Sequence, residues 1–326
     1  MILGKFLPPH AGHEYAVQLG RNFTSRLHVL VCSLDGDPIP GRLRYDWARE
    51  LFPDTNVVHI NADLPQEPAD HPDFWNIWRT TIEQAVGEPI DYVFASEEYG
   101  HRLALELNAR FVPVDLGREQ IPVSGTGIRS DPLRHWRFIP ECVRPFFVKR
   151  VCVFGPESTG KSTLACRLAA EFDTVHVAEF AREWLNPKGG VCDVDDIPII
   201  ARGQAASEDA LARKANRILF CDTDLLLTTI WSEFLFGDCP DSVKAAARHR
   251  LYDLYLLMDV DAPWVDDGQR FLPHRRQEFF ERCRAVLEKS GHSYVTLSGT
   301  PHERFASACN VIRQRFDPDE VRLSSN

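Results

Sequence analysis

Short apolar runs alternate with helix-like segments along the chain, and this alternation occurs once in each half. In the first half the apolar runs are Ile2-Leu3, Leu27–Cys32, Val57–Ile60, Tyr92–Ala95 and Phe111–Val114. In the second half they are Val148–Phe154, Thr174–Ala178, Ile218–Cys221, Leu254–Met258 and Ser293–Leu297. Segments such as 201–216 and 276–289 carry apolar residues three or four positions apart, which predicts helices. Strands that alternate with helices indicate parallel sheets covered by helices.

Two of the apolar runs lead through a glycine-containing turn into an amphipathic segment. The first turn spans 4–13, before a helix to about residue 19, and the second spans 155–163, before a helix to about residue 171. Units of this kind open doubly wound α/β domains, in which ligands bind at the carboxyl ends of the strands. We therefore expect two doubly wound parallel-sheet domains, residues 1–146 and 147–326, which meet at the proline-bearing segment 139–145.

The composition excludes several classes of protein. The chain has 326 residues, 37 basic and 47 acidic, with a net charge of −10, which argues against sequence-independent nucleic-acid binding. It has no run near the roughly eighteen apolar residues of a membrane helix and no apolar signal segment at its start. The nine scattered cysteines form no CxxC pair. We expect a cytoplasmic protein with reduced thiols and no membrane insertion.

The second turn carries a phosphate-binding motif. Its sequence, Gly155-Pro-Glu-Ser158-Thr159-Gly160-Lys161-Ser162-Thr163, fits the P-loop pattern G-x-x-x-x-G-K-[ST]. Such a loop turns backbone N–H groups toward phosphate oxygens at the start of a helix. Lys161 is then expected to contact the β- and γ-phosphates of ATP, and Ser162 to bind Mg²⁺. The preceding strand and the following helix make a chance match improbable.

Acidic residues follow two further strands of the second half. Asp222 comes first after the run 218–221 and is the expected second ligand of Mg²⁺, whereas Asp224 either binds substrate or caps a helix. Glu179 follows the run 174–178 and either accepts a proton from an attacking hydroxyl or binds substrate hydroxyls. Arg182, three residues later, either binds substrate or pairs with Glu179.

A polar segment that carries Trp264 and Arg270 follows the run 254–258. It is either a mobile lid whose arginine reaches the transferred phosphoryl group or a solvated loop. Trp264 is a candidate substrate contact, and Arg270 is a candidate ATP contact.

The first turn places His10 and His13 on one side of a helical first turn. No third metal ligand lies close in sequence, so we expect imidazolium groups that stabilise a triphosphate while it is attacked. A second glycine-rich turn, 123–129, offers the hydroxyls of Ser124 and Thr126 and the guanidinium of Arg129 to the same phosphates. The two turns together predict a second ATP site.

Trp75 and Trp78 lie three residues apart in a helical segment. Core packing explains that spacing, and a stacking surface for a heteroaromatic ring is the alternative. We expect packing for one of the two and leave the other as a candidate substrate contact.

These motifs resemble known ones. Gly4-Lys5-Phe6-x-Pro8-x-His10-x-Gly12-His13 resembles the GKFxPxHxGH opening of nucleotidyltransferases, and Val123-Ser124-x-Thr126-x-Ile128-Arg129 resembles their second motif. Fusion of such a domain to a P-loop domain with the segments 222–224 and 264–268 resembles the bifunctional NadR family over essentially the whole chain. Some members carry a DNA-binding domain before this opening. Here the opening lies at residue 4, so we expect no transcriptional role.

The resemblance implies a Rossmann-like nucleotidyltransferase domain followed by a P-loop kinase domain. The second domain would phosphorylate nicotinamide riboside to the mononucleotide NMN, and the first would join NMN to AMP from ATP, forming NAD⁺ and pyrophosphate. Gly4, Lys5 and Phe6 would then bind ATP beside His10 and His13. Alternatives are an ATP-binding sensor of NAD status with little turnover, or the same chemistry on another phosphomonoester. A homo-oligomer is compatible with the sequence.

Overall fold

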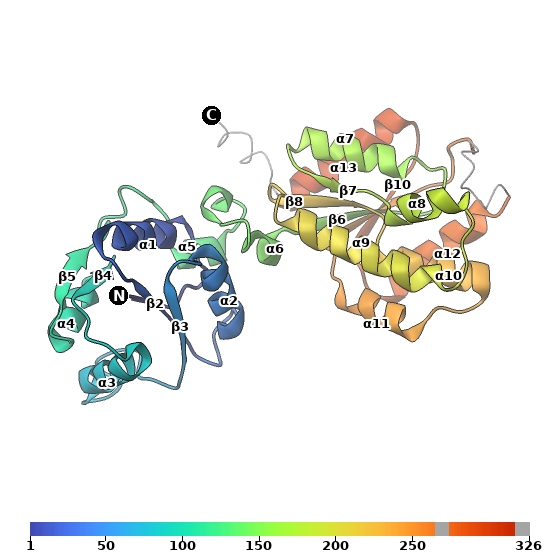
Figure 1. The fold of residues 1–326 in the computed structure, drawn as a ribbon. Coiled ribbons are helices and arrows are strands. Elements are labelled where there is room, and N and C mark those ends of the chain that lie inside the picture. The colour runs from blue at the N-terminus through green and yellow to red at the C-terminus, as the bar shows by residue number, and fades with distance from the viewer. Residues whose placement is uncertain (265–273, 317–326) are drawn as a thin grey trace. The chain divides into compact units, whose positions relative to one another are not determined.

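The computed structural model describes residues 1–264 and 274–316. Contacts within the chain divide it into two compact units between Val143 and Arg144. Each unit is a five-stranded parallel sheet with helices on both faces (Figure 1). The two doubly wound α/β sheets expected from the sequence are thus confirmed.

The first unit has the strand order β3-β2-β1-β4-β5. Its strands are β1 (Ile2–Gly4), β2 (His28–Ser33), β3 (Asn56–Asn61), β4 (Tyr92–Ala95) and β5 (Arg110–Pro113). Its helices are α1 (Ala11–Phe23), α2 (Gly41–Leu51), α3 (Phe74–Val86), α4 (Tyr99–Glu106), α5 (Gly125–Ser130) and the 3₁₀ turn η1 (Trp136–Phe138). The order reverses at β1, so the loop after Gly4 lies at the switch point where such sheets bind ligands.

The second unit has the strand order β10-β9-β6-β8-β7. Its strands are β6 (Lys149–Phe154), β7 (His176–Val177), β8 (Ile218–Asp222), β9 (Leu254–Met258) and β10 (Tyr294–Leu297). Its helices are α6 (Arg144–Phe147), α7 (Lys161–Glu171), α8 (Phe180–Leu185), η2 (Asn186–Lys188), α9 (Asp196–Ala212), α10 (Leu225–Phe236), α11 (Asp241–His249), α12 (Arg276–Lys289) and α13 (Pro301–Phe316). The switch point here is β6, directly before the P-loop.

Helices bury both faces of each sheet. In the first unit, α1 and α2 pack on one face, and α3 and α4 pack on the other. In the second unit, α7 and α13 cover one face and α9 and α10 lie on the other (Figure 1). None of the helices in the described part of the chain combines the length and apolar character needed to cross a membrane.

One helix differs from its expected bounds. The apolar spacing predicted a helix over 201–216, whereas α9 begins at Asp196 and ends at Ala212. The Asp193 carboxylate accepts the N–H groups of Asp195 and Asp196 and so organises the start. At the other end, the N–H of Asn216 donates to Thr174 Oγ1, which leads the chain toward β8.

Candidate functional site

The P-loop joins β6 to α7 in a backbone conformation that glycine permits. Gly155 has φ +128°, and an added Cβ there would meet the Met258 carbonyl oxygen at 3.0 Å. Gly160 has φ +86° and precedes Lys161, the first residue of α7. Ser158 also adopts positive φ, at 56°. This winding places the loop's backbone amides at the positive end of α7, where anions bind favourably.

Lys161, Ser162 and Asp222 meet beside this loop. Lys161 is buried, and its Nζ donates to the Pro156 carbonyl oxygen at 2.8 Å. Asp222 ends β8 next to β6, and the Ser162 hydroxyl donates to its carboxylate. Burial raises the pKa of Asp222, while the Lys161 charge and the Ser162 hydrogen bond act in the opposite direction. The structure thus brings the predicted phosphate and metal ligands together.

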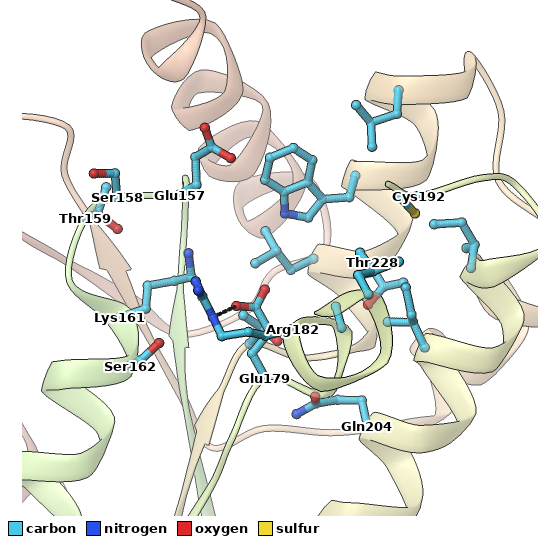
Figure 2. Close-up of a pocket in the computed structure, with 18 of the residues that line it drawn as sticks. Glu157, Ser158, Thr159, Lys161, Ser162, Glu179, Arg182, Cys192, Gln204 and Thr228 are labelled. Atoms are coloured by element: carbon cyan, nitrogen blue, oxygen red, sulfur yellow. Dashed lines mark ion pairs between the residues drawn. The ribbon is translucent and has the colours of Figure 1, made fainter. Parts of the chain in front are cut away.

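A cavity of about 390 Å³ extends from the P-loop between α8, α9 and α10 (Figure 2). It is lined by Glu157, Ser158, Thr159, Gly160, Lys161, Ser162, Thr163, Glu179, Ala181, Arg182, Leu185, Cys192, Ile197, Ile200, Gln204, Thr223, Leu227, Thr228, Trp231 and Leu235. One end is the phosphate-binding loop, and the other is apolar and aromatic. This size and polarity fit a nucleoside placed beside a phosphate group.

Glu179 and Arg182 line the cavity, as the sequence suggested. Glu179 immediately precedes α8, and its Oε2 lies 3.8 Å from Arg182 Nε, an ion pair drawn as a dashed line in Figure 2. The Glu179 side chain is 25% exposed. A carboxylate that is partly open and faces the phosphate end suits either proton transfer or hydroxyl binding.

Two other predicted residues, Asp224 and Trp264, are not part of the cavity lining. Asp224 is the N-cap of α10: it accepts from the N–H of Leu227 and from the Tyr255 hydroxyl, and burial raises its pKa to about 7. Asp224 does not line the cavity. Of the two roles expected for it, substrate binding and helix capping, the structure shows the helix cap. Trp264 Nε1 donates to Glu157 Oε1 at 3.4 Å, which places Trp264 beside the P-loop. Arg270 lies outside the described residues.

Sequence reasoning missed the residues of α9 and α10 that complete the cavity. The indole of Trp231 packs against the Phe279 ring, with ring centroids 4.2 Å apart. This contact fixes the indole as an aromatic side of the cavity. Thr228 and Gln204 supply polar groups to the same cavity. The spacing of residues 227, 228, 231 and 235 marks one helix face, but buried helices show the same spacing in their cores.

Gly203 allows α8 to dock on α9. A Cβ added at Gly203 would come within 2.1 Å of the Phe180 ring. The neighbouring Gln204 Oε1 accepts the N–H of Phe180 at 3.0 Å, which caps the short α8 helix from a different element. Together they fix the start of α8 and therefore the position of Glu179.

We expect Gly203→Ala to destabilise the protein by about 1–3 kcal/mol, because the added methyl group overpacks the Phe180 contact. We also expect the phosphoryl transfer that the resemblance implies for this unit to slow more than the adenylyl transfer implied for the first unit, since Glu179 moves with Phe180. Urea denaturation and separate assays of the two reactions measure these effects. Gly36→Ala is a matched control, because a Cβ there meets nothing within 4 Å. A Gly203→Ala variant with unchanged stability would contradict the packing argument.

In the first unit, His10 and His13 form the start of α1. His10 is the N-cap, and its Nδ1 accepts the N–H of Gly12 at 3.1 Å. His13 Nδ1 accepts the N–H of His10 at 3.2 Å, and the two ring centroids are 3.9 Å apart. Because both Nδ1 atoms accept backbone N–H groups, the proton of each neutral ring is on Nε2.

In the ligand-free site the two rings are neutral, and the expected imidazolium form beside a bound triphosphate stays a prediction. Burial lowers the pKa of His10 to about 4, and the Arg118 charge acts in the same direction. Burial also lowers the pKa of His13 well below its usual value, with further contributions from His10 and Arg118. Without a bound anion both rings are therefore neutral Nε2–H donors, and the negative charge of a phosphate beside them would raise both pKa values.

We expect ¹⁵N NMR of the ligand-free protein to show both rings as neutral Nε2–H tautomers at pH 6. Their folded pKa values lie below the ordinary value of 6.5, so the unfolded state binds more protons as the pH falls from about 6.5 toward 4. These histidines therefore contribute a loss of stability on acidification in that window, which urea denaturation at several pH values measures. A ring that titrates near 6.5 would contradict the assignment.

Phe6 supports these histidines from beneath. Its backbone adopts φ 48°, unusual for a residue with a side chain, and its ring is 1% exposed. The ring stacks on His13 with centroids 4.5 Å apart, and Gly4 lies against its edge. Phe6 and Gly4 therefore shape the site by packing, and the contact with ATP expected of both residues stays a prediction.

The glycine-rich segment 123–129 packs against the histidine-bearing segment 4–13. Ser124 is the N-cap of α5, and its Oγ accepts the N–H of Gly127 at 3.0 Å. Arg129 donates to the Leu7 carbonyl oxygen and to Thr126 Oγ1. A Cβ at Gly125 would meet the same Leu7 oxygen at 2.5 Å. The two motifs thus form one site, in which Ser124 acts as a helix cap.

Further residues complete this edge of the first sheet. Arg118, after β5, lies close enough to influence both histidines, and its position outside the motifs gave no signal in the sequence. Lys5 and Trp78 line one small cavity, and Trp78 Nε1 donates to the Pro65 carbonyl oxygen at 2.9 Å. Trp78 is part of the core, whereas Trp75 lies under the guanidinium of Arg102, 5.7 Å from its ring centroid.

Comparison with known proteins gives two close relatives by sequence. The chain is 30% identical to the "Trifunctional NAD biosynthesis/regulator protein NadR" of Escherichia coli K12, over 96% of this chain and 82% of the relative. It is 31% identical to the protein of the same name from Salmonella typhimurium LT2, with the same coverage. Residues 150–304 match the model of an AAA domain.

Solved structures show the same fold. A NadR protein crystallised with NR superposes with a TM-score of 0.79 at 22% identity, covering 97% of this chain and 95% of that one. A NadR structure with NAD and AMP-PNP matches with the same values. The likeness extends over both units of the chain.

Proposed function

Because the chain belongs to the NadR family, we propose that it is a bifunctional enzyme of NAD biosynthesis. In this proposal the second unit phosphorylates nicotinamide riboside to NMN with ATP. The first unit then joins NMN to the adenylyl group of a second ATP, giving NAD⁺ and pyrophosphate. The observation that carries the proposal is the cavity that continues from the P-loop to the aromatic wall at Trp231.

In the kinase reaction, the 5′-hydroxyl oxygen of the riboside attacks the γ-phosphorus of ATP. A new O–P bond forms, the bond to ADP breaks, and Glu179 accepts the hydroxyl proton. Lys161 and the loop amides stabilise the charge on the phosphoryl oxygens. Arg182 orients the Glu179 carboxylate through their ion pair.

Mg²⁺ fits the residues beside the P-loop. Asp222 Oδ1 is buried and has no hydrogen-bond partner among the described residues, and the Ser162 hydroxyl contacts the same carboxylate. One carboxylate and one hydroxyl are the protein ligands expected where phosphates and water supply the others. We propose that Ser162 and Asp222 hold Mg²⁺, which supplies charge neutralisation at the phosphates.

In the adenylyl transfer, a phosphate oxygen of NMN attacks the α-phosphorus of ATP, and pyrophosphate leaves. His10 and His13 donate Nε2–H groups to the phosphate oxygens, and Arg129 and Lys5 add positive charge. No protein nucleophile is required, since the substrate phosphate is the nucleophile.

The cysteines, none of which pairs with another, support a cytoplasmic location, which we also propose. All nine cysteines are free thiols, and seven of them are buried. The net charge of −10 supports small-molecule substrates in preference to nucleic acid.

The test is incubation of the full chain with nicotinamide riboside, ATP and Mg²⁺, with NMN and NAD⁺ measured separately by chromatography. We expect NMN to appear first and NAD⁺ to follow, and supplied NMN to yield NAD⁺ directly. Binding of ATP without formation of either product would overturn the enzyme assignment in favour of a nucleotide sensor.

A further inference from the structure

Two arginine side chains bind carbonyl oxygens of the P-loop. Arg304 of α13 is 3% exposed, and its Nη1 donates to the Thr159 carbonyl oxygen at 2.8 Å. Arg276, the first residue of α12, donates from Nη1 to the Ser158 carbonyl oxygen at 3.1 Å. Neither arginine is among the residues that line the cavity, and neither has a role in the chemistry above.

Both guanidinium groups also donate to carbonyl oxygens in the segments that follow β9 and β10. These oxygens belong to Asp259 and Gly299, bound by Arg304, and to Val260 and Ala262, bound by Arg276. Arg304 pairs in addition with the Asp261 carboxylate. A guanidinium group has five N–H donors in one rigid plane, so it holds several acceptors at fixed positions relative to one another. The two arginines therefore tie the P-loop to the carboxyl ends of β9 and β10.

The bound carbonyl groups fix the direction of the next two amides. The peptide bonds after Ser158 and Thr159 are trans, so each carbonyl group and the N–H of the following residue point in opposite directions. An arginine on the Ser158 oxygen thus turns the Thr159 N–H away from it, and one on the Thr159 oxygen does the same for Gly160. Thr159 and Gly160 line the cavity beside Lys161, where amides of such a loop bind phosphate oxygens.

The backbone of the loop also requires support from outside. Ser158 has φ 56°, a conformation that costs free energy in a residue with a side chain and persists only where its surroundings hold it. The hydrogen bond from Arg276 to the Ser158 carbonyl oxygen is such a contact. Amides that are oriented before a ligand arrives lose less conformational freedom when it binds.

We propose that Arg276 and Arg304 are positioning residues that orient the Thr159 and Gly160 amides for the β-phosphate of a nucleoside di- or triphosphate. Each arginine acts through a backbone carbonyl group and does not itself contact the nucleotide. The inference deepens the proposed kinase site and rests on the nucleotide binding assigned to it.

The test is a titration of the full chain with ADP and with AMP in the presence of Mg²⁺, followed at the backbone ¹⁵N–H resonances of Thr159 and Gly160. These resonances report on the P-loop, so nucleotide bound to the first unit does not enter the measurement. Arg276 is the first position to vary, because it is only partly buried and its loss disturbs the fold less than loss of Arg304.

We expect Arg276→Met to weaken ADP binding by about tenfold and AMP binding by less than about twofold, because only ADP carries a β-phosphate. Arg276→Lys keeps the charge but not the planar fork, so it should still weaken ADP binding by about threefold. In the ADP complex, loss of Arg276 should shift the Thr159 amide resonance more than that of Gly160. Arg304→Lys should show the reverse order. Arg284→Met, at an exposed position of α12, is the matched control and should leave ADP affinity unchanged.

Several results would overturn the inference. Unchanged ADP affinity in an Arg276→Met protein that is less stable to urea would show a structural role alone. Full ADP affinity in Arg276→Lys would assign the effect to charge, and equal weakening of AMP would place it at the nucleoside. Weaker ADP binding with wild-type amide resonances would mean that Arg276 contacts the nucleotide directly.

The same titration separates this inference from the proposed function. If the P-loop resonances respond to ADP as expected but the protein phosphorylates no nucleoside, the kinase assignment fails and the role of the two arginines stands. If those resonances do not respond to ADP in the wild type, both proposals fail.

Discussion

Replacement of Lys161 by alanine is expected to lower phosphorylation of nicotinamide riboside by at least about 10²–10³-fold. Lys161 is the buried ammonium group at the phosphate end of the cavity, and its Nζ lies over the P-loop. Its charge stabilises phosphoryl oxygens in the transition state more than in the ground state, so kcat should fall along with kcat/KM. Initial rates of NMN formation at saturating ATP measure the effect.

The same variant should still convert supplied NMN to NAD⁺ at the wild-type rate, because the histidine site belongs to the other unit. Lys289→Ala, at an exposed position at the end of α12, is the matched control and should leave both rates unchanged. Loss of both activities in a folded Lys161→Ala protein would contradict the assignment of one reaction to each unit.

His13→Ala should have the opposite effect, lowering adenylyl transfer by about 10²–10³-fold and leaving the kinase reaction intact. The variant loses the Nε2–H donor to the phosphates. It also loses the Nδ1 that accepts the His10 N–H and the ring that stacks on Phe6, so α1 should lose about 1 kcal/mol of capping stability. NAD⁺ formation from supplied NMN, with thermal unfolding in parallel, measures both effects.

His13→Asn separates the donor from the cap, because its side-chain oxygen can accept the His10 N–H while its amide does not reach the Nε2 position. We expect this variant to recover stability and remain slow. Full activity in His13→Asn would show that capping alone explains the histidine. His101→Ala, an exposed histidine on α4, is the control for histidine loss in the same unit.

Much of the fold was predictable because parallel strands carry a local signal. Each of the ten strands described lies at or within a few residues of an expected apolar run, and the NadR resemblance is confirmed. Buried strands need continuous apolar side chains, and those runs are visible without tertiary information. Bounds were less certain: the expected strand 174–178 is only His176–Val177, since its neighbours already leave the sheet. The expected domain boundary at 146/147 stays a prediction beside the observed division between Val143 and Arg144.

The ionisation of the histidines was not predictable from their spacing. Spacing placed His10 and His13 on one helical turn, but the protonation state depends on burial and on which backbone N–H each ring accepts. Those partners exist only once α1 has formed and the loop after Gly4 has folded back. Arg118, in the segment after β5, acts on the same rings at a distance in sequence that no motif spans.

The sequence by itself determined the two phosphate-binding turns, since a P-loop and a histidine-bearing helix start are local objects made by consecutive residues. Only the tertiary structure decided what lies opposite them. The helices α9 and α10 reach the P-loop only because they pack on the same sheet. They contribute the Trp231 indole, the Gly203 contact with Phe180 and the Gln204 side chain. Phosphate chemistry needs a few adjacent amides, whereas recognition of the acceptor needs side chains from separate elements. Their proximity is set by the packing of the whole unit.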